Sequence, residues 1–328
     1  MTVEALPANQ PETFYRGAGR IAEFRRGSAR PDRPEDWVGS VTTRFGLAPS
    51  GLSTLSDGRV LASAIAEDPQ WWVGPQRSDT GVLVKLLDAG QRLPLHVHPD
   101  RRFANAHLAS PYGKTEAWVI LSARPGAYVH LGFSRDVAAG ELAGWVRNQR
   151  TDEMLKATNK ISVAAGDAIL CPAGLPHAIG DGILLVEIQE PTDFSVLLEY
   201  EDFGLDGGHL GLGYDLALQC VDRGAWTPKR LEELRGPDQL LPEVAASGRL
   251  LPKPAAEFFT ARRLRGGDHL EQGFGVLVVV SGEGTLTGAK DNRRLRRADT
   301  LLIPYAAGAL DLHGQLEAFH LTAARTGR

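Results

Sequence analysis

Two histidines that stand two positions apart are the first residues in the sequence whose types and spacing could do chemistry. They are His96 and His98, within the segment LHVHPD at 95–100. In a β-strand, residues i and i+2 point to the same face, so both imidazoles could reach one ion. Taken alone, the pair is better interpreted as two surface or buried histidines without a metal.

Two further motifs complete a set of metal ligands. Glu116 closes a Gly-Lys-Thr-Glu segment, and His177 ends a Gly-x5-Pro-x-Gly-x2-His pattern, in which a tight turn delivers the histidine. Three imidazoles and a carboxylate suit Zn, Fe, Mn, Co or Ni, so the ligand types do not choose the metal. Because these motifs reinforce the histidine pair, we predict one divalent metal ion on His96, His98, Glu116 and His177.

A lysine stands beside these ligands. Lys114 precedes Glu116 by two residues, so on an extended strand both side chains would face the same way. A cation there could stabilise negative charge that develops on a substrate oxygen. The other histidines have no such context, and we interpret them as ordinary surface or core residues. They are His107, His130, His209, His269, His313 and His320.

Short apolar runs must position these side chains. The 37 glycines and 20 prolines punctuate runs rich in Val, Ile and Leu, at 81–87, 117–121, 183–188 and 276–280. Many short strands broken by turn residues predict a mainly β protein of the sandwich or barrel type.

Helices are expected between the two β-rich parts. The runs LALQCVD at 216–222 and PKRLEELRG at 228–236 predict helices, and Thr227 followed by Pro228 is a typical helix start. A proline-containing stretch at 241–254 follows. We therefore expect an N-terminal metal-binding domain at 1–205, a helical connector at 206–252 and a metal-free C-terminal domain at 253–328.

The two β-rich parts resemble each other. GDAILCPAG at 166–174 is similar to ADTLLIPYAAG at 298–308, and WVILS at 118–122 is similar to LVVVS at 277–281. The common order of the two motifs suggests a duplicated barrel. This alignment places Gly275 at the position of Glu116 and Ala309 at that of His177, so only the first barrel is expected to bind metal.

Several blocks of the sequence form a recognisable series. They are EDWVGS at 35–40, LVKLLDA at 83–89, VHPD at 97–100, GKTEAW at 113–118, PGA at 125–127 with GF at 132–133, and EIQ at 187–189 followed by Asp193. In this order the blocks resemble the cupin proteins and, among them, the type I phosphomannose isomerase family. The resemblance implies two cupin barrels (double-stranded β-helices, or jelly rolls) joined by a short helical connector. It also implies a zinc-dependent isomerase that interconverts mannose 6-phosphate and fructose 6-phosphate through an enediol.

The resemblance also implies roles for individual residues. The family's zinc ligands fall on His98, Glu116 and His177, with His96 in place of a glutamine. Its active-site lysines match Lys85 and Lys114. Its active-site glutamate matches Glu187, a candidate base or proton shuttle with Lys85 as an alternative donor.

Two positions depart from the family pattern. Pro94 stands where the family has a serine that helps to bind phosphate, and Leu197 stands where it has an arginine, ten residues after Glu187. Neither side chain can bind an oxyanion. In the folded chain, Arg147 or Arg150 could take the place of the missing family arginine. Three alternatives stay open: an isomerase for an unphosphorylated sugar, an iron-dependent cupin dioxygenase and a non-catalytic sugar-binding cupin.

The composition limits the partners. The 36 basic and 40 acidic side chains give a formal net charge of −4, which brings no general attraction to nucleic acid or anionic lipid. We interpret the basic run of Arg293, Arg294, Arg296 and Arg297 as a solvated hairpin, with a nucleic-acid contact as the weaker alternative. Two cysteines provide no disulfide framework, and no signal peptide or bilayer-spanning run is evident. We therefore expect a cytoplasmic protein whose partner is a small sugar or sugar phosphate.

Overall fold

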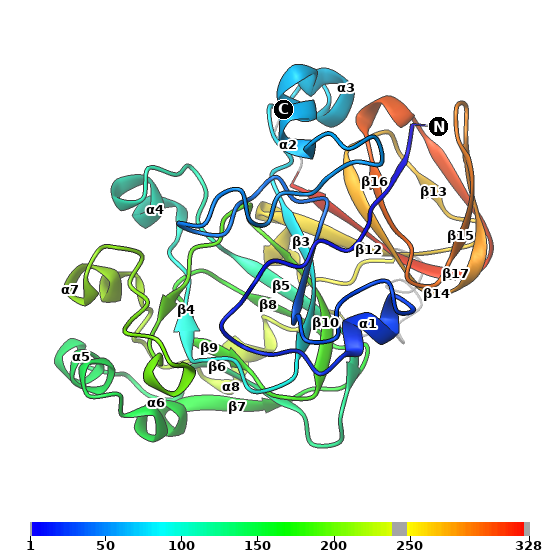
Figure 1. Ribbon diagram of the computed structural model, residues 1–328. Coiled ribbons are helices and arrows are strands. Elements are labelled where there is room, and N and C mark those ends of the chain that lie inside the picture. The colour runs from blue at the N-terminus through cyan, green and yellow to red at the C-terminus, as the bar shows by residue number, and fades with distance from the viewer. Residues whose placement is uncertain (1, 238–247, 325–328) are drawn as a thin grey trace.

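The computed structural model describes residues 2–237 and 248–324 and is mainly β, as predicted (Figure 1). Two five-stranded antiparallel sheets form the N-terminal barrel, in the orders β2-β3-β10-β5-β8 and β11-β4-β9-β6-β7. The strands of the first sheet are β2 (Glu35–Val38), β3 (Leu83–Ala89), β5 (Glu116–Ala123), β8 (Ala168–Cys171) and β10 (Ile183–Gln189). Those of the second are β4 (His96–Val97), β6 (Tyr128–Phe133), β7 (Thr158–Ser162), β9 (His177–Ile179) and β11 (Val196–Leu197).

The C-terminal part forms a single seven-stranded sheet that is curled by two long strands. β14 and β17 each contain 14 residues and pair with each other along most of their length. The chain start contributes an edge strand to this sheet, because Glu4 of β1 pairs with Leu302 of β16. The strands are β1 (Glu4–Ala5), β12 (Phe259–Arg265), β13 (His269–Leu270), β14 (Gly275–Gly288), β15 (Asn292–Arg296), β16 (Thr300–Ile303) and β17 (Leu310–Ala323).

Strand register supports the duplication of the barrel. In the first barrel Glu116 pairs with Cys171, and in the second Gly275 pairs with Ile303. Both partners directly precede the proline that the two sequence motifs share. The pairing therefore places Gly275 at the position of Glu116, as the sequence alignment does.

An irregularity in the ladder recurs at the same place in both barrels. The β10–β5 pairing passes over Leu121, and the β14–β17 pairing passes over Val280. Each skipped residue directly precedes a serine in the motif WVILS or LVVVS. A β-bulge kept at one position of two related strands is typical of a common origin.

Helices are short and surround the barrels rather than forming a layer of their own. The α-helices are α1 (Arg20–Phe24), α2 (Leu61–Glu67), α3 (Pro69–Val73), α4 (Arg101–His107), α5 (Ala139–Arg147), α6 (Thr151–Ala157), α7 (Tyr214–Ala217) and α8 (Pro228–Glu232). Single 3₁₀ turns are η1 (Glu201–Phe203), η2 (Leu218–Cys220), η3 (Lys253–Glu257) and η4 (Tyr305–Ala307). In the described residues no helix is long and apolar enough to cross a membrane.

The connector contains the predicted helices in shortened form. The run expected to be one helix at 216–222 is divided between α7 and η2. The side chain of Thr227 accepts a hydrogen bond from the backbone of Arg230, as its predicted capping role requires. α8 ends earlier than expected because Arg235 forms a bridge to Ile169 of β8. The stretch at 241–254 lies partly outside the described residues.

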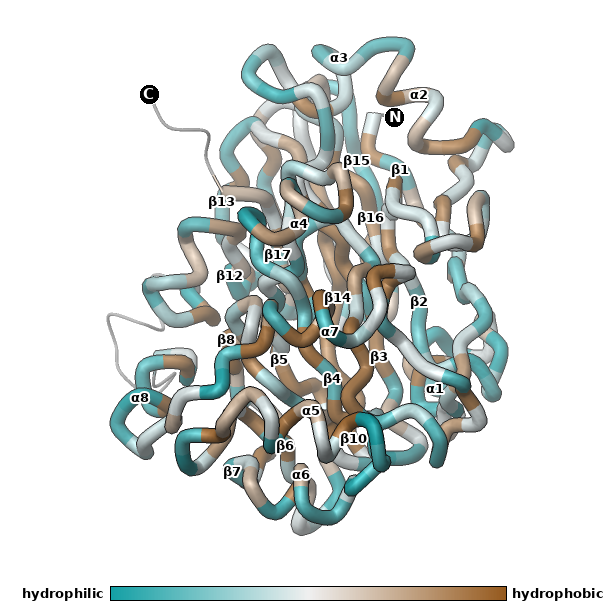
Figure 2. Tube along the Cα trace, turned by 90° about the vertical axis from the view of Figure 1, so that its left-hand side faces the viewer, coloured by the Kyte–Doolittle hydropathy of each residue, from teal (hydrophilic) through white to brown (hydrophobic). Residues whose placement is uncertain are grey.

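Hydrophobic residues of both barrels meet in one shared cluster, beside one separate cluster in each barrel. The shared cluster joins Val84 and Val186 of the first barrel to Val276 and Leu321 of the second. Figure 2 shows hydrophobic residues concentrated along the inner strands β3, β5 and β14. Burying these side chains supplies the main favourable free energy of folding and fixes the site-bearing strands.

A buried ion pair ties the N-terminal segment to both barrels. Arg25 Nη2 lies 2.5 Å from Asp36 Oδ2, with 5% and 0% of the two side chains exposed. Arg25 also donates to Thr300 Oγ1 at 2.6 Å. One guanidinium therefore connects α1, β2 and β16.

We expect Arg25→Met to lower the free energy of unfolding by about 3–5 kcal/mol, because it leaves the Asp36 carboxylate buried without its cation. The check is urea denaturation followed by circular dichroism. Arg30→Met is the matched control, since Arg30 pairs with Asp32 on the surface at 3.1 Å, with 64% and 59% of the side chains exposed. Equal midpoints for the two variants would contradict a stabilising role of the buried pair.

Candidate functional site

Three of the predicted ligands converge where two strands of one sheet meet. His96 of β4 pairs directly with His177 of β9, and His98 follows β4 by one residue. One ring nitrogen from each histidine lies within 4.8 Å of the others. Glu116 begins β5 in the facing sheet and points into the same space. The structure therefore brings together the four residues that the sequence motifs singled out.

Each of the three imidazoles is oriented by its own hydrogen bond to the backbone. The Nδ1 atom is the bonded nitrogen in every case, and a carbonyl oxygen can only accept, so Nδ1 carries the hydrogen. The Nε2 atoms then present lone pairs to the centre, as metal-ligating histidines do. The acceptors for His96, His98 and His177 are the carbonyls of Pro94, Phe194 and Leu175, at 2.8, 2.7 and 2.7 Å.

The Glu116 carboxylate faces these lone pairs at close range. His98 Nε2 lies 2.9 Å from Glu116 Oε2, and His177 Nε2 lies 3.3 Å from Glu116 Oε1. His177 Nε2 is buried and has no hydrogen-bond partner among the described residues. Because both groups are acceptors, the contact needs a cation to compensate it. A divalent metal ion with three nitrogen ligands and one oxygen ligand fits this arrangement.

The protonation states of His96, His98 and Glu116 are those that metal binding requires. Burial lowers the pKa of His98 to about 3 and holds the pKa of His96 well below its usual value, so both rings are neutral. Burial by itself raises the pKa of Glu116, but Lys114 and the neighbouring histidines outweigh it and hold that pKa well below its usual value. A neutral imidazole and an ionised carboxylate are the forms that bind a metal.

Cys171 forms an alternative group with Glu116 and His177. Burial raises the pKa of its thiol well above the usual value, with a further contribution from Glu116. A protonated thiol is a poor ligand. The histidine set is therefore the better candidate.

Lys114 lies directly against the ligand cluster. Its Nζ atom is 3.1 Å from Glu116 Oε2 and 3.0 Å from His98 Nε2, and the side chain is 5% exposed. The alternation of side chains along the strand places Lys114 and Glu116 on the same face.

A second charged cluster lies on the central strands of the first sheet. Lys85 of β3 pairs in register with Glu187 of β10, and their side chains meet at 3.2 Å. Glu35 lies 3.6 Å from the same ammonium group and accepts hydrogen bonds from Tyr15 and Trp37. The cluster holds a buried cation between two buried carboxylates.

Burial acts on both partners of this pair. It raises the pKa of Glu187, and the negative charge of Glu116 adds to that effect. Burial lowers the pKa of Lys85, but Glu187 and Glu35 outweigh it, so this pKa lies above its usual value. Lys85 is therefore a fixed positive charge, whereas Glu187 is a carboxylate that takes up a proton more readily than an exposed glutamate.

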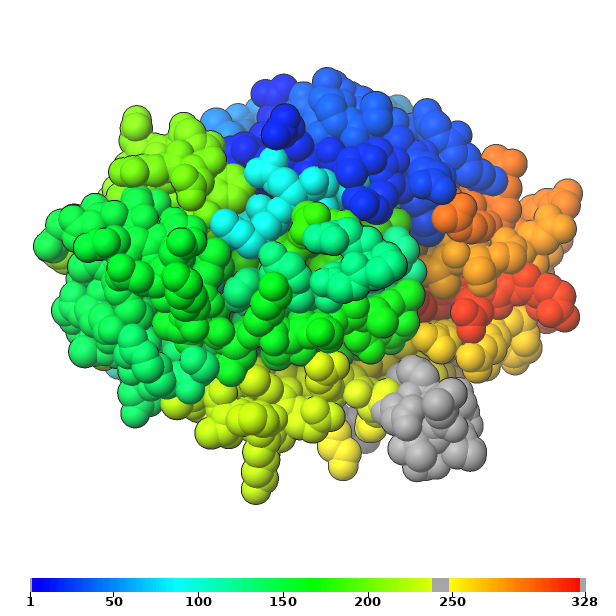
Figure 3. All heavy atoms as spheres, turned by 90° about the horizontal axis from the view of Figure 1, so that it is seen from below, coloured from blue at the N-terminus to red at the C-terminus, as the bar shows by residue number. Residues whose placement is uncertain are grey.

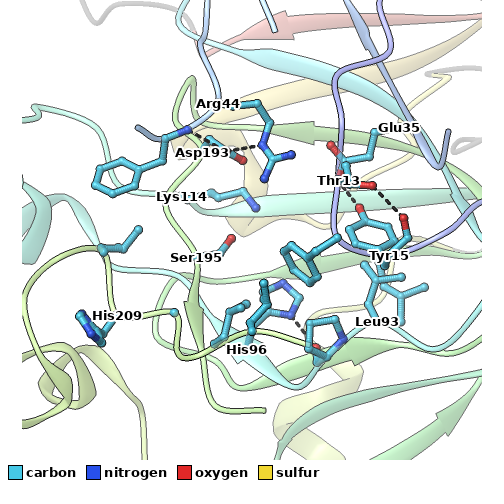
Figure 4. Close-up of a pocket in the computed structure, with 18 of the residues that line it drawn as sticks. Thr13, Tyr15, Glu35, Arg44, Leu93, His96, Lys114, Asp193, Ser195 and His209 are labelled. Atoms are coloured by element: carbon cyan, nitrogen blue, oxygen red, sulfur yellow. Dashed lines mark hydrogen bonds and ion pairs between the residues drawn. The ribbon is translucent and has the colours of Figure 1, made fainter. Parts of the chain in front are cut away.

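Both clusters open into one cavity of about 520 Å³ (Figure 4). In Figure 4, Arg44 and Asp193 meet at the upper side of the cavity and His96 lies at the lower side. Pro94 and Leu197 also line the cavity, and the backbone pairs Leu197 with His96. The side next to His96 therefore contains apolar side chains at both positions that depart from the family pattern.

The arginine that lines the cavity is not one that the sequence suggested. Arg147 and Arg150 are not among the lining residues, and Arg150 is exposed and pairs with Glu153 at 3.4 Å. Arg44 lines the cavity, with its Nε atom 3.2 Å from Asp193 Oδ2. Its position could not be deduced from spacing, because residues 44 and 193 meet only in the folded chain.

Two more parts of the cavity lining were not predicted from the sequence. Glu35, within the matching block EDWVGS, carries a side chain that lines the cavity. Residues 206–211 line it as well, and they include His209, which we had interpreted as ordinary. The glycine-rich run DGGHLGLG at 206–213 was a usable signal, because such a run favours a close-fitting loop.

Comparison with known proteins finds mannose-6-phosphate isomerases among the relatives in sequence and in fold. The chain is 28% identical over 240 residues to mannose-6-phosphate isomerase ManA of Bacillus subtilis, covering 72% of this chain and 73% of that protein. It is 28% identical over 280 residues to mannose-6-phosphate isomerase of Streptococcus mutans, with 82% and 84% covered. No protein-family model matches the sequence.

The solved structure of mannose-6-phosphate isomerase from Bacillus subtilis has the same fold. It superposes with a TM-score of 0.77 at 20% sequence identity and covers 98% of this chain and 99% of that chain. The resemblance to the phosphomannose isomerases and the expected cupin fold are thereby confirmed. The chain therefore resembles the mannose-6-phosphate isomerases, which are sugar isomerases, in sequence and shares their fold.

Proposed function

We propose that this protein is a metal-dependent aldose–ketose isomerase that binds one zinc ion through His96, His98, Glu116 and His177. The main support is the buried contact between the Nε2 lone pairs and the Glu116 carboxylate. A bound ion would supply a Lewis acid that polarises or orients the sugar's carbonyl and hydroxyl oxygens. The division into domains at residues 205 and 252 stays a prediction.

The remaining residues supply proton transfer and charge. Isomerisation moves a proton from C2 of the aldose to C1 through an enediol, so it needs a base near both carbons. Glu187 is the candidate base, because it is buried, lines the cavity and is held by Lys85. Lys114, which lies beside the predicted metal ligands, would stabilise negative charge on the enediolate oxygens.

Two substrate classes fit the cavity differently. The two relatives compared above are named for mannose 6-phosphate, and a phosphate here would need Arg44, which would have to share its charge with Asp193. An unphosphorylated sugar is the second candidate. The apolar side chains of Pro94 and Leu197 favour it, because neither can donate to a phosphate.

We expect the zinc-loaded protein to exchange the C1 or C2 hydrogen of a sugar with solvent. The measurement is proton NMR in D₂O with mannose 6-phosphate and fructose 6-phosphate beside free mannose, fructose and lyxose. Exchange in the phosphosugars alone, with a raised KM in Arg44→Gln, identifies a phosphate substrate. Exchange in free sugars alone identifies a changed specificity. Exchange in none of them argues against an isomerase, and oxygen consumption or ligand binding without turnover would then identify the alternatives.

Glu187→Gln should lower kcat by about 10²- to 10⁴-fold while leaving the metal content unchanged, because it removes a base and not a ligand. The base must be ionised, so protonation at low pH should abolish activity. Because burial raises its pKa, kcat/KM of the wild type should begin to fall at a pH above the ordinary value of about 4.3. Glu153→Gln, at a glutamate with 48% of its side chain exposed, is the control. Unchanged kcat in Glu187→Gln would exclude this base.

Metal removal should destabilise the folded chain as well as inactivate it. A ligand present at 100 times its Kd stabilises by about 2.7 kcal/mol, so chelation should lower Tm and added zinc should restore it. His177→Ala should bind less metal and show a smaller response to the chelator. His107→Ala, at an exposed histidine of α4, should behave as the wild type. The proposed metal site would be contradicted if the wild-type protein contained no stoichiometric metal and its Tm did not change with the chelator.

A further inference from the structure

A second cavity, of about 570 Å³, lies between the end of α1 and the β14–β15 hairpin, and it shares no lining residue with the first. Its lining contains five arginines, from two distant parts of the chain: Arg25, Arg26, Arg293, Arg294 and Arg296. In Figure 3 the blue N-terminal segment lies directly against the orange segment that contains the hairpin.

The charges of this lining do not balance. Arg25 is neutralised by Asp36, which leaves four guanidinium groups against the carboxylates of Glu283 and Asp299. Arg294 meets Glu283 at 3.3 Å, and Arg26 meets Asp299 at 3.3 Å. Two positive charges therefore remain in the lining, although the chain as a whole carries a net charge of −4.

Arg293 has hydrogen-bonding capacity that the protein leaves unused. Its Nη2 atom donates to the carbonyl of Val3 at 2.9 Å, which fixes the side chain. Its Nε atom is buried and has no hydrogen-bond partner among the residues that the structure describes. The Oδ1 atom of Asp291 accepts from the backbone amides of Thr2 and Val3, and its Oδ2 atom has no hydrogen-bond partner among the described residues. The Arg293 Nε donor is therefore not used by the protein and is available to an acceptor in the cavity.

The backbone at Arg26 is also unusual. Its φ is 57°, in the left-handed region that favours glycine, and its side chain is directed to Asp299 in the cavity. This conformation ends α1, because the amides of Arg26 and Gly27 donate to the carbonyls of Glu23 and Ala22 as in a Schellman cap. The helix end therefore holds the Arg26 side chain at the cavity.

We propose that this cavity binds a phosphorylated small metabolite through its phosphoryl group. Guanidinium groups match phosphate oxygens with two parallel hydrogen bonds, and several around one concave site suit a dianion or a higher charge. The volume exceeds that of a single phosphate ion, so it has room for the rest of an ester. This site is separate from the isomerase cavity and does not depend on the activity proposed above.

The test measures binding of inorganic pyrophosphate and inorganic phosphate to the metal-loaded full chain by calorimetry. Pyrophosphate should bind with one-to-one stoichiometry, more weakly as salt rises. The double variant Arg294→Gln/Arg296→Gln should lose at least about tenfold in affinity from the removed charges. Its side chains are 82% and 68% exposed, so folding should be retained. Arg265→Gln is the matched control, since Arg265 lies in the same sheet and pairs with Glu317 at 3.1 Å.

A thermal measurement gives a second readout. Pyrophosphate should raise the Tm of the wild type and of Arg265→Gln, but not that of the double variant. The Arg44→Gln variant should bind pyrophosphate normally, which separates this site from the isomerase cavity. No saturable binding at millimolar pyrophosphate, equal binding by the double variant, or binding lost only in Arg44→Gln would overturn the proposal. Binding of a short DNA duplex without binding of pyrophosphate would also overturn it.

Discussion

A buried carboxylate that faces imidazole lone pairs is the constraint on which the rest of the site depends. Glu116 is 1% exposed, and the two nearest Nε2 atoms lie within 3.3 Å of its oxygens. Backbone carbonyls hold the protons on the far nitrogens, so the rings cannot turn a donor toward the carboxylate. Burying such a group of acceptors is costly unless a cation joins them. Lys114 provides one positive charge, and a metal ion would provide the rest.

Much of this centre could be predicted from sequence because its spacing is local. Histidines two apart on a strand, a lysine two residues before a glutamate, and a histidine after a Gly-Pro turn each follow from strand and turn geometry. The β-rich fold and the cap at Thr227 were accessible for the same reason. Arg44 beside Asp193 and the pairing of β1 with β16 were not, because tertiary contacts between distant segments create them.

The shape of the cavity next to His96 illustrates this difference. Leu197 could be identified from the sequence as an apolar residue at a position expected to carry charge. The residues that Leu197 contacts could not be identified from the sequence. A Cβ atom at Gly208 would lie 2.4 Å from Leu197 Cγ, so the glycine-rich loop packs directly on the leucine side chain. The backbone of Leu197 also donates to the carbonyl of Gly208 at 2.7 Å. Leucine and glycine together keep the loop close, and a longer charged side chain would push it away.

The second barrel shows what happens to the same positions without a ligand carboxylate. The register that aligns Glu187 with Lys85 aligns His320 with Arg262, and Gly275 stands where Glu116 would be. A Cβ at Gly275 would lie 2.4 Å from His320 Nε2, so the histidine ring occupies the space that a side chain there would need. Burial lowers the pKa of His320 to about 4, which keeps the ring neutral. The duplicated scaffold therefore tolerates the loss of the carboxylate because one neighbouring ring fills its volume without adding charge.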